Sequence, residues 1–169
     1  LASGASGAAS VRSGDPGAAA LGRAIEGVAR SLARQQAADG EGATTLITCQ
    51  VSGARDDVDA RGAARAVISS SLVKAAIHGG DPNWGRIAGA VGNAHAADSW
   101  VLEAAGLAPA DAAARAGTPA QVEPDRLRIA VAGHPVYAGV PLPFDRDAAR
   151  VAMTAGEVLI RLDLGVGDG

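Results

Sequence analysis

The sequence predicts a layered mixed α/β fold, in which helices pack against a sheet. Hydrophobic residues make up 48% of the 169-residue chain, which is enough for a buried core, whereas aromatic residues make up only 2%. The core must therefore be built mainly from Ala, Val, Leu and Ile. Segments with helical periodicity occur along the chain together with segments in which polar and apolar residues alternate, and this mixture is typical of layered α/β proteins.

The first predicted helix follows a Gly- and Ser-rich lead-in at residues 1–14. Asp15 and Pro16 form a helix start signal, and Gly40 marks the end of the helix. The apolar positions between them recur at spacings of four, three and four residues, which indicates an amphipathic helix. These positions are Leu21, Ile25, Val28 and Leu32.

A strand and a second helix are predicted next. Residues 44–51 are rich in strand-forming side chains, and their alternation places one apolar face inward. Gly53 turns the chain, and Asp56 or Asp57 then caps a helix that runs to about Ile68. The side chains expected on the buried side of this helix are Val58, Ala64, Val67 and Ile68.

Residues 72–77 are interpreted as a short buried strand, because the run is mostly apolar with a β-branched bias, although periodicity alone leaves a helix open. Gly79 and Gly80 break this run. Asp81 then offers a cap for a helix whose first residue is Pro82, at a position that needs no free N–H. The narrow apolar face of that helix consists of Ile87, Ala90, Val91 and Ala94.

The rest of the chain begins with a weakly patterned segment. Residues 97–123 are rich in Ala and Pro, and we expect a variable surface excursion with a short helix near residues 111–116. A hairpin follows, with strands at 126–131 and 136–140 that are joined at Gly133-His134. The last two predicted elements are a helix at 145–154, capped by Asp145, and a strand at 157–164.

The turn that precedes the helix at Pro82 is the best candidate binding site on local geometry. Amides at a helix start carry partial positive charge, and glycines let a ligand come close, so a carboxylate or a phosphate can sit here. The pocket or anion-loop candidates are Gly80, Asp81, Asn83 and Arg86, of which Arg86 can hold a carboxylate in a bidentate fork. The competing interpretation is structural, with Asp81 as a cap, Trp84 packed on the sheet and Arg86 paired internally.

Three stretches of the sequence resemble one known family. GGDPNWGR, preceded by SSLVKAAIH, is similar to the β-chain signature of the ornithine acetyltransferase family, the bifunctional glutamate N-acetyltransferases of arginine biosynthesis. DGEGAT, at residues 39–44, resembles the substrate-contact segment of that family, and DLGVGDG, at residues 163–169, resembles a strand end near its C-terminus. The resemblance covers most of the chain except roughly residues 97–123, and it implies a layered fold like the family's β chain, similar to N-terminal-nucleophile folds.

The resemblance implies that the parent protein moves an acetyl group from N-acetylornithine to glutamate through an acetyl-threonine intermediate. It gives the substrate-contact role to Glu41, for which a solvated turn glutamate is the alternative, while Thr45 stands where the family usually has Lys. The nucleophile is a threonine whose free α-amine acts as its base, and residue 1 here is Leu1. No catalytic residue is therefore assigned within this chain, and we expect the chain alone to be inactive.

The partners and the domain division also follow from the resemblance. It implies an α chain that is cut autocatalytically from the same precursor, an α2β2 assembly and a cytoplasmic location. It implies no metal and no organic cofactor, although some members accept acetyl-CoA as donor. Residues 1–53 are expected to be the C-terminal part of the nucleophile-bearing layer domain, and residues 54–169 the C-terminal domain of the β chain.

Composition limits the remaining classes of function. The net charge of −3 gives no reason to expect nucleic-acid binding, and no apolar run reaches membrane-spanning length. Cys49 is the single cysteine, so an internal disulfide is excluded. His78, His95 and His134 are too scattered for a metal motif. Neither end carries a start or leader signal, and we expect both to be cuts inside a longer chain.

Two alternative functions remain open from the sequence. One is a non-catalytic amino-acid-binding or assembly module of the same fold, which the missing nucleophile motivates. The other is a self-processing aminopeptidase of similar layered fold, against which the GGDPNWGR and DGEGAT stretches argue.

Overall fold

The computed structural model describes residues 5–167, and the chain divides into two compact units, 1–43 and 44–169. The boundary lies between Ala43 and Thr44, immediately before the first strand. The division expected from the resemblance, after residue 53, concerns domains of the complete protein and stays a prediction.

The first unit contains the predicted amphipathic helix, α1 (Ala18–Ala38). It begins later than predicted, because the Asp15 carboxylate accepts a hydrogen bond from the Arg12 amide (2.7 Å), while Gly17 occupies the cap position without a side-chain bond. The four predicted apolar positions are 46% to 61% exposed, and none of the described residues of α1 is buried. We call these positions the α1 stripe: Leu21, Ile25, Val28 and Leu32.

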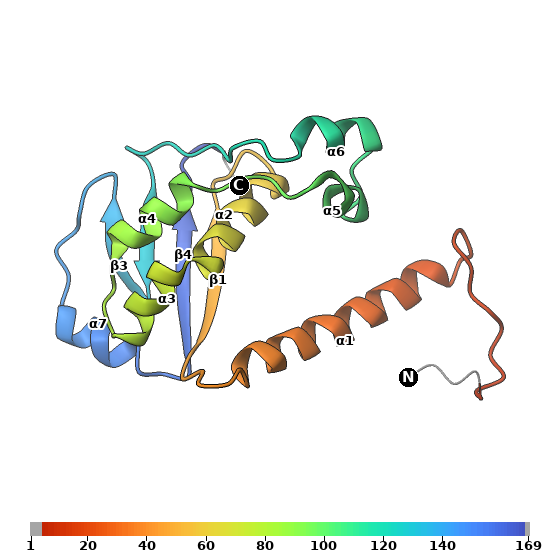
Figure 1. Cartoon of the computed structure of the whole chain (residues 1–169), viewed down its shortest axis with the longest axis horizontal. Helices are drawn as coiled ribbons and strands as arrows, with labels where there is room; N and C mark the ends of the chain where they lie inside the picture. Colours follow the sequence, from red (N-terminus) through yellow and green to blue (C-terminus); the bar gives the residue numbers. More distant parts are fainter. Residues whose placement is uncertain (1–4, 168–169) are drawn as a thin grey trace. The chain divides into compact units, whose positions relative to one another are not determined.

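The second unit is built on a four-stranded sheet of β1 (Leu46–Ser52), β2 (Arg128–Val131), β3 (His134–Ala138) and β4 (Glu157–Asp163). The strand order is β1-β4-β2-β3 (Figure 1). β1 and β4 are parallel, whereas β2 is antiparallel to both β4 and β3. The bounds of these four strands lie within two residues of the predicted ones.

The hairpin between β2 and β3 turns one residue earlier than predicted. Its central residues are Ala132 and Gly133, both with positive φ (48° and 85°), and His134 already belongs to β3. Two consecutive positive φ angles match the right-handed twist of paired strands, which is why such turns prevail in tight hairpins.

The strand predicted at residues 72–77 is wrong, because these residues belong to a helix, α3 (Ser71–His78). The Ser70 hydroxyl accepts a hydrogen bond from the Val73 amide (3.3 Å) and caps this helix. The buried side chains of α3 are Val73, Ala76 and Ile77. Their spacing fits one face of a helix and not the two-residue period of a strand, but a six-residue apolar run carries too little pattern to show this in advance.

The helix before it, α2 (Asp57–Ser69), starts as predicted with Asp56 as its cap. Its buried side differs from the prediction and consists of Asp59, Gly62, Ala63 and Val67. Of the four side chains expected there, only Val67 is buried, and Ile68 is 40% exposed. The small residues bring the helix close to its neighbours, since a Cβ on Gly62 would lie 2.7 Å from the His95 carbonyl oxygen.

The remaining helices are α4 (Trp84–Gly92), α5 (Ser99–Ala104), α6 (Pro109–Arg115) and α7 (Arg146–Ala152). α4 begins two residues after the predicted start at Pro82. α6 overlaps the short helix predicted near residues 111–116, whereas α5 was not predicted. Asp145 caps α7 as expected, because its carboxylate accepts a hydrogen bond from the Ala148 amide (3.0 Å).

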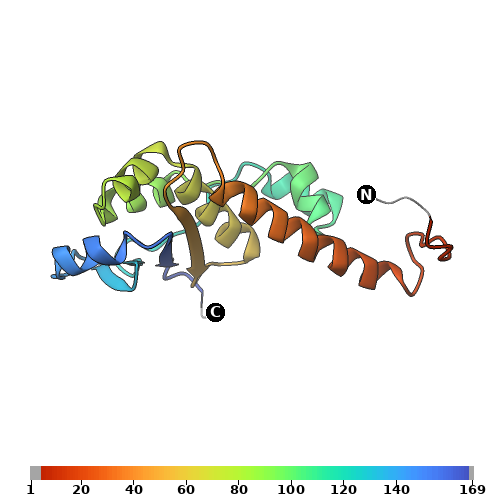
Figure 2. The same ribbon diagram turned by 90° about the horizontal axis from the view of Figure 1, so that it is seen from below.

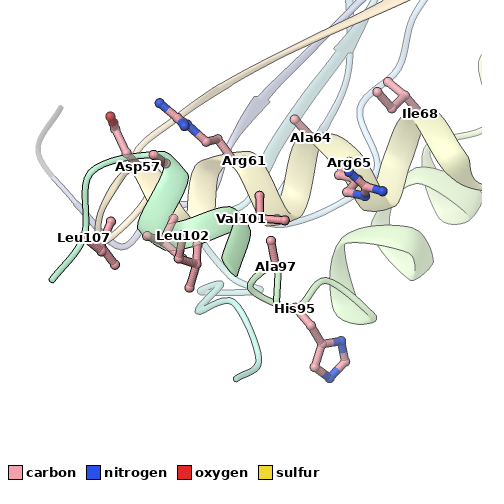
Figure 3. A pocket seen from close by; sticks show the side chains of 13 residues that line it. Asp57, Arg61, Ala64, Arg65, Ile68, His95, Ala97, Val101, Leu102 and Leu107 are labelled. Atoms are coloured by element: carbon pink, nitrogen blue, oxygen red, sulfur yellow. The ribbon is translucent and has the colours of Figure 1, made fainter. Parts of the chain in front are cut away.

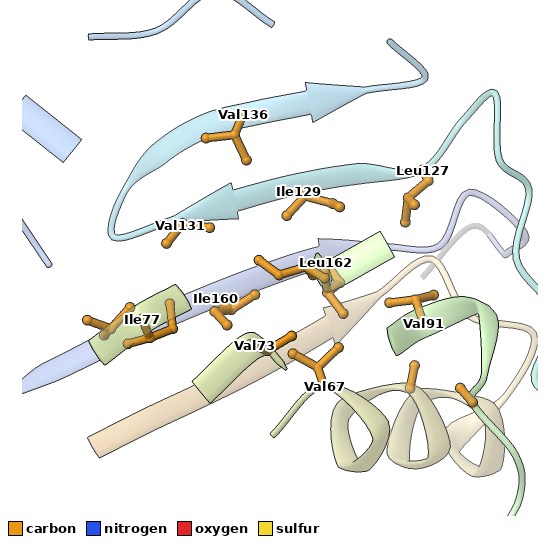
Figure 4. Close-up of a cluster of buried hydrophobic side chains, with 14 of the residues drawn as sticks. Val67, Val73, Ile77, Val91, Leu127, Ile129, Val131, Val136, Ile160 and Leu162 are labelled. Atoms are coloured by element: carbon orange, nitrogen blue, oxygen red, sulfur yellow. The ribbon is translucent and has the colours of Figure 1, made fainter. Parts of the chain in front are cut away.

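The core lies between one face of the sheet and helices α2, α3 and α4, which cover that face (Figures 1 and 2). It is aliphatic, as the composition predicts, and Figure 4 shows most of it: Val67, Val73, Ile77, Val91, Ile129, Val131, Ile160 and Leu162. Residues of β1 and β4 that alternate onto the opposite face are largely polar, and there Thr48 donates a hydrogen bond to Glu157 (2.6 Å).

Candidate functional site

The GGDPNWGR loop, residues 79–86, connects α3 to α4 and begins as a Schellman motif. Gly80 has a φ of +65°, and its amide donates to the Ile77 carbonyl (3.0 Å). The Asp81 amide donates to the Ala76 carbonyl (2.9 Å). These bonds satisfy the last carbonyls of α3, and the left-handed residue they require explains the glycine.

Asn83, and not Asp81, caps α4. The side-chain oxygen of Asn83 accepts a hydrogen bond from the Arg86 amide (3.1 Å), and its side-chain nitrogen donates to the Asp81 carboxylate (2.9 Å). The predicted cap at Asp81 with Pro82 as the first helical residue is therefore wrong by two positions. An amide side chain can accept from the helix and donate to the acid at once, which a carboxylate cannot do.

Arg86 and Trp84 anchor α4 to its neighbours. The Arg86 guanidinium donates to the Leu72 carbonyl of α3 (3.0 Å). The Trp84 ring stacks on the Tyr137 ring of β3, with centroids 4.8 Å apart and planes inclined by 25°. These contacts agree with the structural interpretation of the loop, in which its polar groups bind one another and the adjacent backbone.

Glu41 lies in the first unit, in the turn that follows α1. The turn is closed by a hydrogen bond from the Ala43 amide to the Gly40 carbonyl (2.8 Å), and Gly42 has a φ of +74°. Glu41 is exposed, and within residues 5–167 its carboxylate has no hydrogen bond or ion pair. The loop candidates Gly80, Asp81, Asn83 and Arg86 belong to the second unit.

The histidines and the cysteine form no common centre. His78 lies 3.3 Å from the Thr44 hydroxyl through Nδ1, and His95 lies 2.9 Å from the Asn93 carbonyl through Nδ1. Within residues 5–167, no group of three or more His, Cys, Asp or Glu side chains could hold a metal ion. Burial raises the pKa of Cys49 to about 12, so its thiol stays protonated at neutral pH. Among the helices of residues 5–167, none is long and apolar enough to cross a membrane.

The DLGVGDG stretch begins with the last residue of β4 and continues into a turn beside the end of β1. Its last two residues lie outside the described residues. The Asp163 carboxylate accepts a hydrogen bond from the Gly165 amide (3.0 Å). The Val166 and Gly167 amides donate to the Gly53 carbonyl (2.8 and 2.9 Å). A Cβ on Gly167 would clash with the Ala54 carbonyl, so the described glycines of this stretch permit close backbone packing.

The sequence did not predict the most buried charged side chain within residues 5–167. Asp59 is 0% exposed, and its carboxylate accepts hydrogen bonds from Arg115 (2.8 Å), Arg55 (3.0 Å) and the Gln121 amide (3.1 Å). Arg115 also donates to both carboxylate oxygens of Asp56 (3.0 Å each). We call Arg55, Asp56, Asp59 and Arg115 the Asp59 cluster. It fastens α6 to the start of α2, and its only sequence signal was a pair of acids three residues apart at a helix start.

Two opposing effects set the ionisation of the Asp59 cluster. Burial favours the neutral acid, but hydrogen bonds from Arg115, the Gln121 amide and Arg55, together with the charge of Arg115, outweigh it and hold the pKa of Asp59 below its usual value. The hydrogen bond from Arg115 to Asp59 in turn raises the pKa of Arg115. Both groups are charged at neutral pH, and the cluster is a structural ion network.

A four-stranded mixed sheet with α2, α3 and α4 packed on one face defines a layered mixed α/β protein. A family model described as the ArgJ family matches residues 1–169, and this chain belongs to that family. The predicted family and fold class are thereby confirmed.

Two curated proteins illustrate the similarity. The arginine biosynthesis bifunctional protein ArgJ of Deinococcus radiodurans is 44% identical over 144 residues, which cover 85% of this chain and 31% of that protein. The glutamate N-acetyltransferase of Methanopyrus kandleri is 43% identical over 150 residues, covering 86% of this chain and 33% of that protein. The chain thus spans about a third of the length of these curated relatives.

A solved structure has the same fold. The crystal structure of the arginine biosynthesis bifunctional protein ArgJ from Bacillus halodurans matches with a TM-score of 0.72 at 30% identity. The match covers 99% of this chain and 68% of the solved chain.

Proposed function

We propose that this chain is part of an enzyme that moves an acetyl group from N-acetylornithine to glutamate. The family match along residues 1–169 carries the proposal, together with relatives that are named for arginine biosynthesis and for glutamate N-acetyl transfer. A threonine hydroxyl outside this chain attacks the acetyl carbonyl carbon, and ornithine leaves with the proton on its amine. The glutamate amine then attacks the acetyl-threonine ester and frees the hydroxyl.

Glu41 is the proposed substrate contact. Its carboxylate is exposed in a turn and has no partner within residues 5–167, so it is available to a ligand ammonium group. A charge-assisted bond of this kind would orient the amino acid at the acetyl-accepting position. The GGDPNWGR loop is proposed to shape or support the pocket wall, a role for which its closed hydrogen-bond network is suited.

The proposed partner is an α chain from the same precursor, in an α2β2 assembly. The chain spans 68% of the solved Bacillus halodurans chain but about a third of the curated relatives, so the solved chain is about half as long as those relatives. That ratio supports a protein that is cut into two chains of similar length. The exposed α1 stripe supports the same proposal, because an apolar face left exposed on a helix marks a place where another part of an assembly packs.

The test is acetyl transfer by the complete parent protein, with Glu41→Gln compared to wild type. We expect a rise in KM for glutamate of about tenfold or more, since a hydrogen bond to a charged group is lost. Glu103→Gln is the matched control, because Glu103 is exposed on α5 and its carboxylate has no hydrogen bond or ion pair within residues 5–167. Equal kinetics of the two variants would remove Glu41 from the site.

The same assay compares acetyl transfer by the parent protein with acetyl transfer by the 169-residue chain. The 169-residue chain alone is expected to transfer no acetyl group, and the parent protein is expected to show two chains by mass spectrometry, one of which begins with threonine. Transfer by the chain alone, or an uncut active parent, would contradict the proposed mechanism. A parent without transferase activity that still binds glutamate would favour the non-catalytic binding module.

A further inference from the structure

A groove of about 420 Å³ lies between α2 and α5 of the second unit (Figure 3). Its α2 side includes Val58, Ala64 and Ile68, which the sequence assigned to the core, and its α5 side includes Val101 and Leu102. We call it the α2–α5 groove. Its volume falls within the usual range for small-molecule sites, which are likewise lined mainly by apolar side chains.

Two arginines give the α2–α5 groove a positive charge. Arg61 and Arg65 line it one helical turn apart on α2, and Figure 3 labels both side chains. Both are exposed, and within residues 5–167 neither guanidinium has a hydrogen bond or an ion pair. Within residues 5–167, Asp57 is the one acid that lines the groove, and His95 also borders it. The two guanidiniums therefore exceed the carboxylate by one charge when His95 is neutral.

The walls of the α2–α5 groove are held in place without a ligand. The Asp59 cluster fixes α6, which follows α5, to the start of α2. The chain before α5 and the chain after α6 are joined by a hydrogen bond from the Ala96 amide to the Thr118 carbonyl (2.9 Å). Leu102 and Ala112 are buried at 4% and 0% exposed and pack this segment internally. A site whose walls are fixed in advance loses little conformational entropy on binding.

We propose that the α2–α5 groove binds a small carboxylate with an aliphatic body. The guanidiniums of Arg61 and Arg65 hold the carboxylate, because a planar donor fork matches its two oxygens. The aliphatic body lies along Val58 and Val101. An inorganic anion would use the arginines but leave the apolar walls exposed to water, so the lining favours an amphiphilic ligand. This site is separate from the proposed acetyl transfer, because neither Glu41 nor the loop candidates line it.

Octanoate is the probe, and the full 169-residue chain labelled with ¹⁵N is the target. Saturable shifts are expected for amides of α2 and α5 in two-dimensional NMR spectra. Octan-1-ol has the same aliphatic body without the charge, and it should bind about tenfold more weakly or worse, since the charge-assisted bonds are absent. The double variant Arg61→Gln/Arg65→Gln should weaken octanoate to the same extent and leave octan-1-ol unchanged.

Two further variants make the test specific. Ala64→Leu narrows the α2–α5 groove and should weaken both probes. Arg12→Gln/Arg23→Gln removes two charges from the first unit and should leave both affinities unchanged. Each variant is folded if its amide signals outside the groove match those of the wild-type spectrum. Equal binding of octanoate and octan-1-ol, octanoate shifts confined to the α1 stripe, no saturable binding, or no effect of Arg61→Gln/Arg65→Gln would each overturn the proposal.

Discussion

The helix α1 and the helices of the second unit present the same kind of apolar pattern but reach different outcomes. On α1, four apolar side chains at helical spacing remain 46% to 61% exposed. On α3 and α4, Val73, Ile77 and Ile87 are at most 3% exposed, because the sheet lies beneath them. An amphipathic pattern therefore predicts a helix with one apolar face, but it does not say which surface covers that face.

The two units obtain their stability from different sources. The second unit buries a continuous aliphatic cluster, and burial of apolar surface is the main favourable term in folding. α1 buries none of its described residues, so its stabilisation within this chain is local to the helix. We expect the two units to respond differently to the same kind of substitution.

The largest effect is expected from a truncation in the core of the second unit. Ile160 is 0% exposed, and Ile160→Ala should lower the free energy of unfolding by about 2–5 kcal/mol. Ile25→Ala, on the exposed α1 stripe, should change it by less than about 0.5 kcal/mol. Trp84 and Trp100 both lie in the second unit, so urea unfolding followed by tryptophan fluorescence measures that unit. Similar losses in the two variants would show that α1 is packed in solution.

A smaller loss is expected when the Asp59 cluster is broken. Asp59→Asn removes the charge that Arg115 and Arg55 bind, and it should destabilise the second unit by about 2 kcal/mol, since charged partners are left poorly satisfied. Asp57→Asn is the matched control, because Asp57 is exposed two residues before Asp59, and loss of its charge should cost about 0.5 kcal/mol through the helix dipole. Equal losses of unfolding free energy in the two variants, measured by the same urea titration, would mean that the buried cluster stabilises the second unit no more than an exposed carboxylate does.

The pH dependence of stability gives a second measurement on Asp59. Its pKa is lowered in the folded state, so the folded protein binds fewer protons there than the unfolded chain. The contribution is therefore fully present above the ordinary carboxyl pKa of about 4, and it is lost as the pH falls through the folded pKa. Wild type should lose more stability than Asp59→Asn between about pH 4 and pH 2. Parallel curves for the two proteins would contradict the assigned direction of the shift.

How much could be predicted from the sequence depends on how far each feature reaches along the chain. The four strands, α1 and the caps at Asp56 and Asp145 follow from local patterns, and the structure places them within a few residues. The six-residue run inside α3 was misassigned, because so short an apolar run does not distinguish a helix from a strand.

Features that join distant segments could not be predicted in the same way. The Asp59 cluster needs Arg115, 56 residues further along the chain, and no local pattern indicates that pairing. The predicted side of α2 was wrong for the same reason, because Val58 and Ile68 line the open α2–α5 groove and not the core. Among the candidate site residues, the GGDPNWGR stretch indicated a glycine turn before a helix, and the structure has both. The contact of Glu41 with a substrate stays a prediction.

Gly80, in the loop before α4, and Gly89, inside α4, are expected to respond in opposite directions to substitution by alanine. Gly80 has a φ of +65°, and its added Cβ would lie 3.2 Å from the Arg150 side chain. Gly80→Ala should therefore cost about 1–2 kcal/mol. Gly89 lies inside α4 with open space around it, and Gly89→Ala should stabilise by up to about 1 kcal/mol, since alanine is the better helix former. Thermal or urea unfolding of both variants checks the opposite signs, and the same sign for both would contradict the motif.

The smallest effect on unfolding, but a distinct effect on association, is expected from the α1 stripe. An exposed apolar face on a 21-residue helix favours self-association when its partner is missing. Ile25→Glu/Val28→Glu should abolish concentration-dependent association of the 169-residue chain in sedimentation velocity and leave the urea midpoint of the second unit unchanged. Ala19→Glu/Ala33→Glu adds the same charge to α1 away from the stripe, by the 3.6-residue period, and should leave association intact. If both double variants abolished association, general charge repulsion would explain it. If neither double variant abolished association, the surface through which the chain associates would lie outside α1.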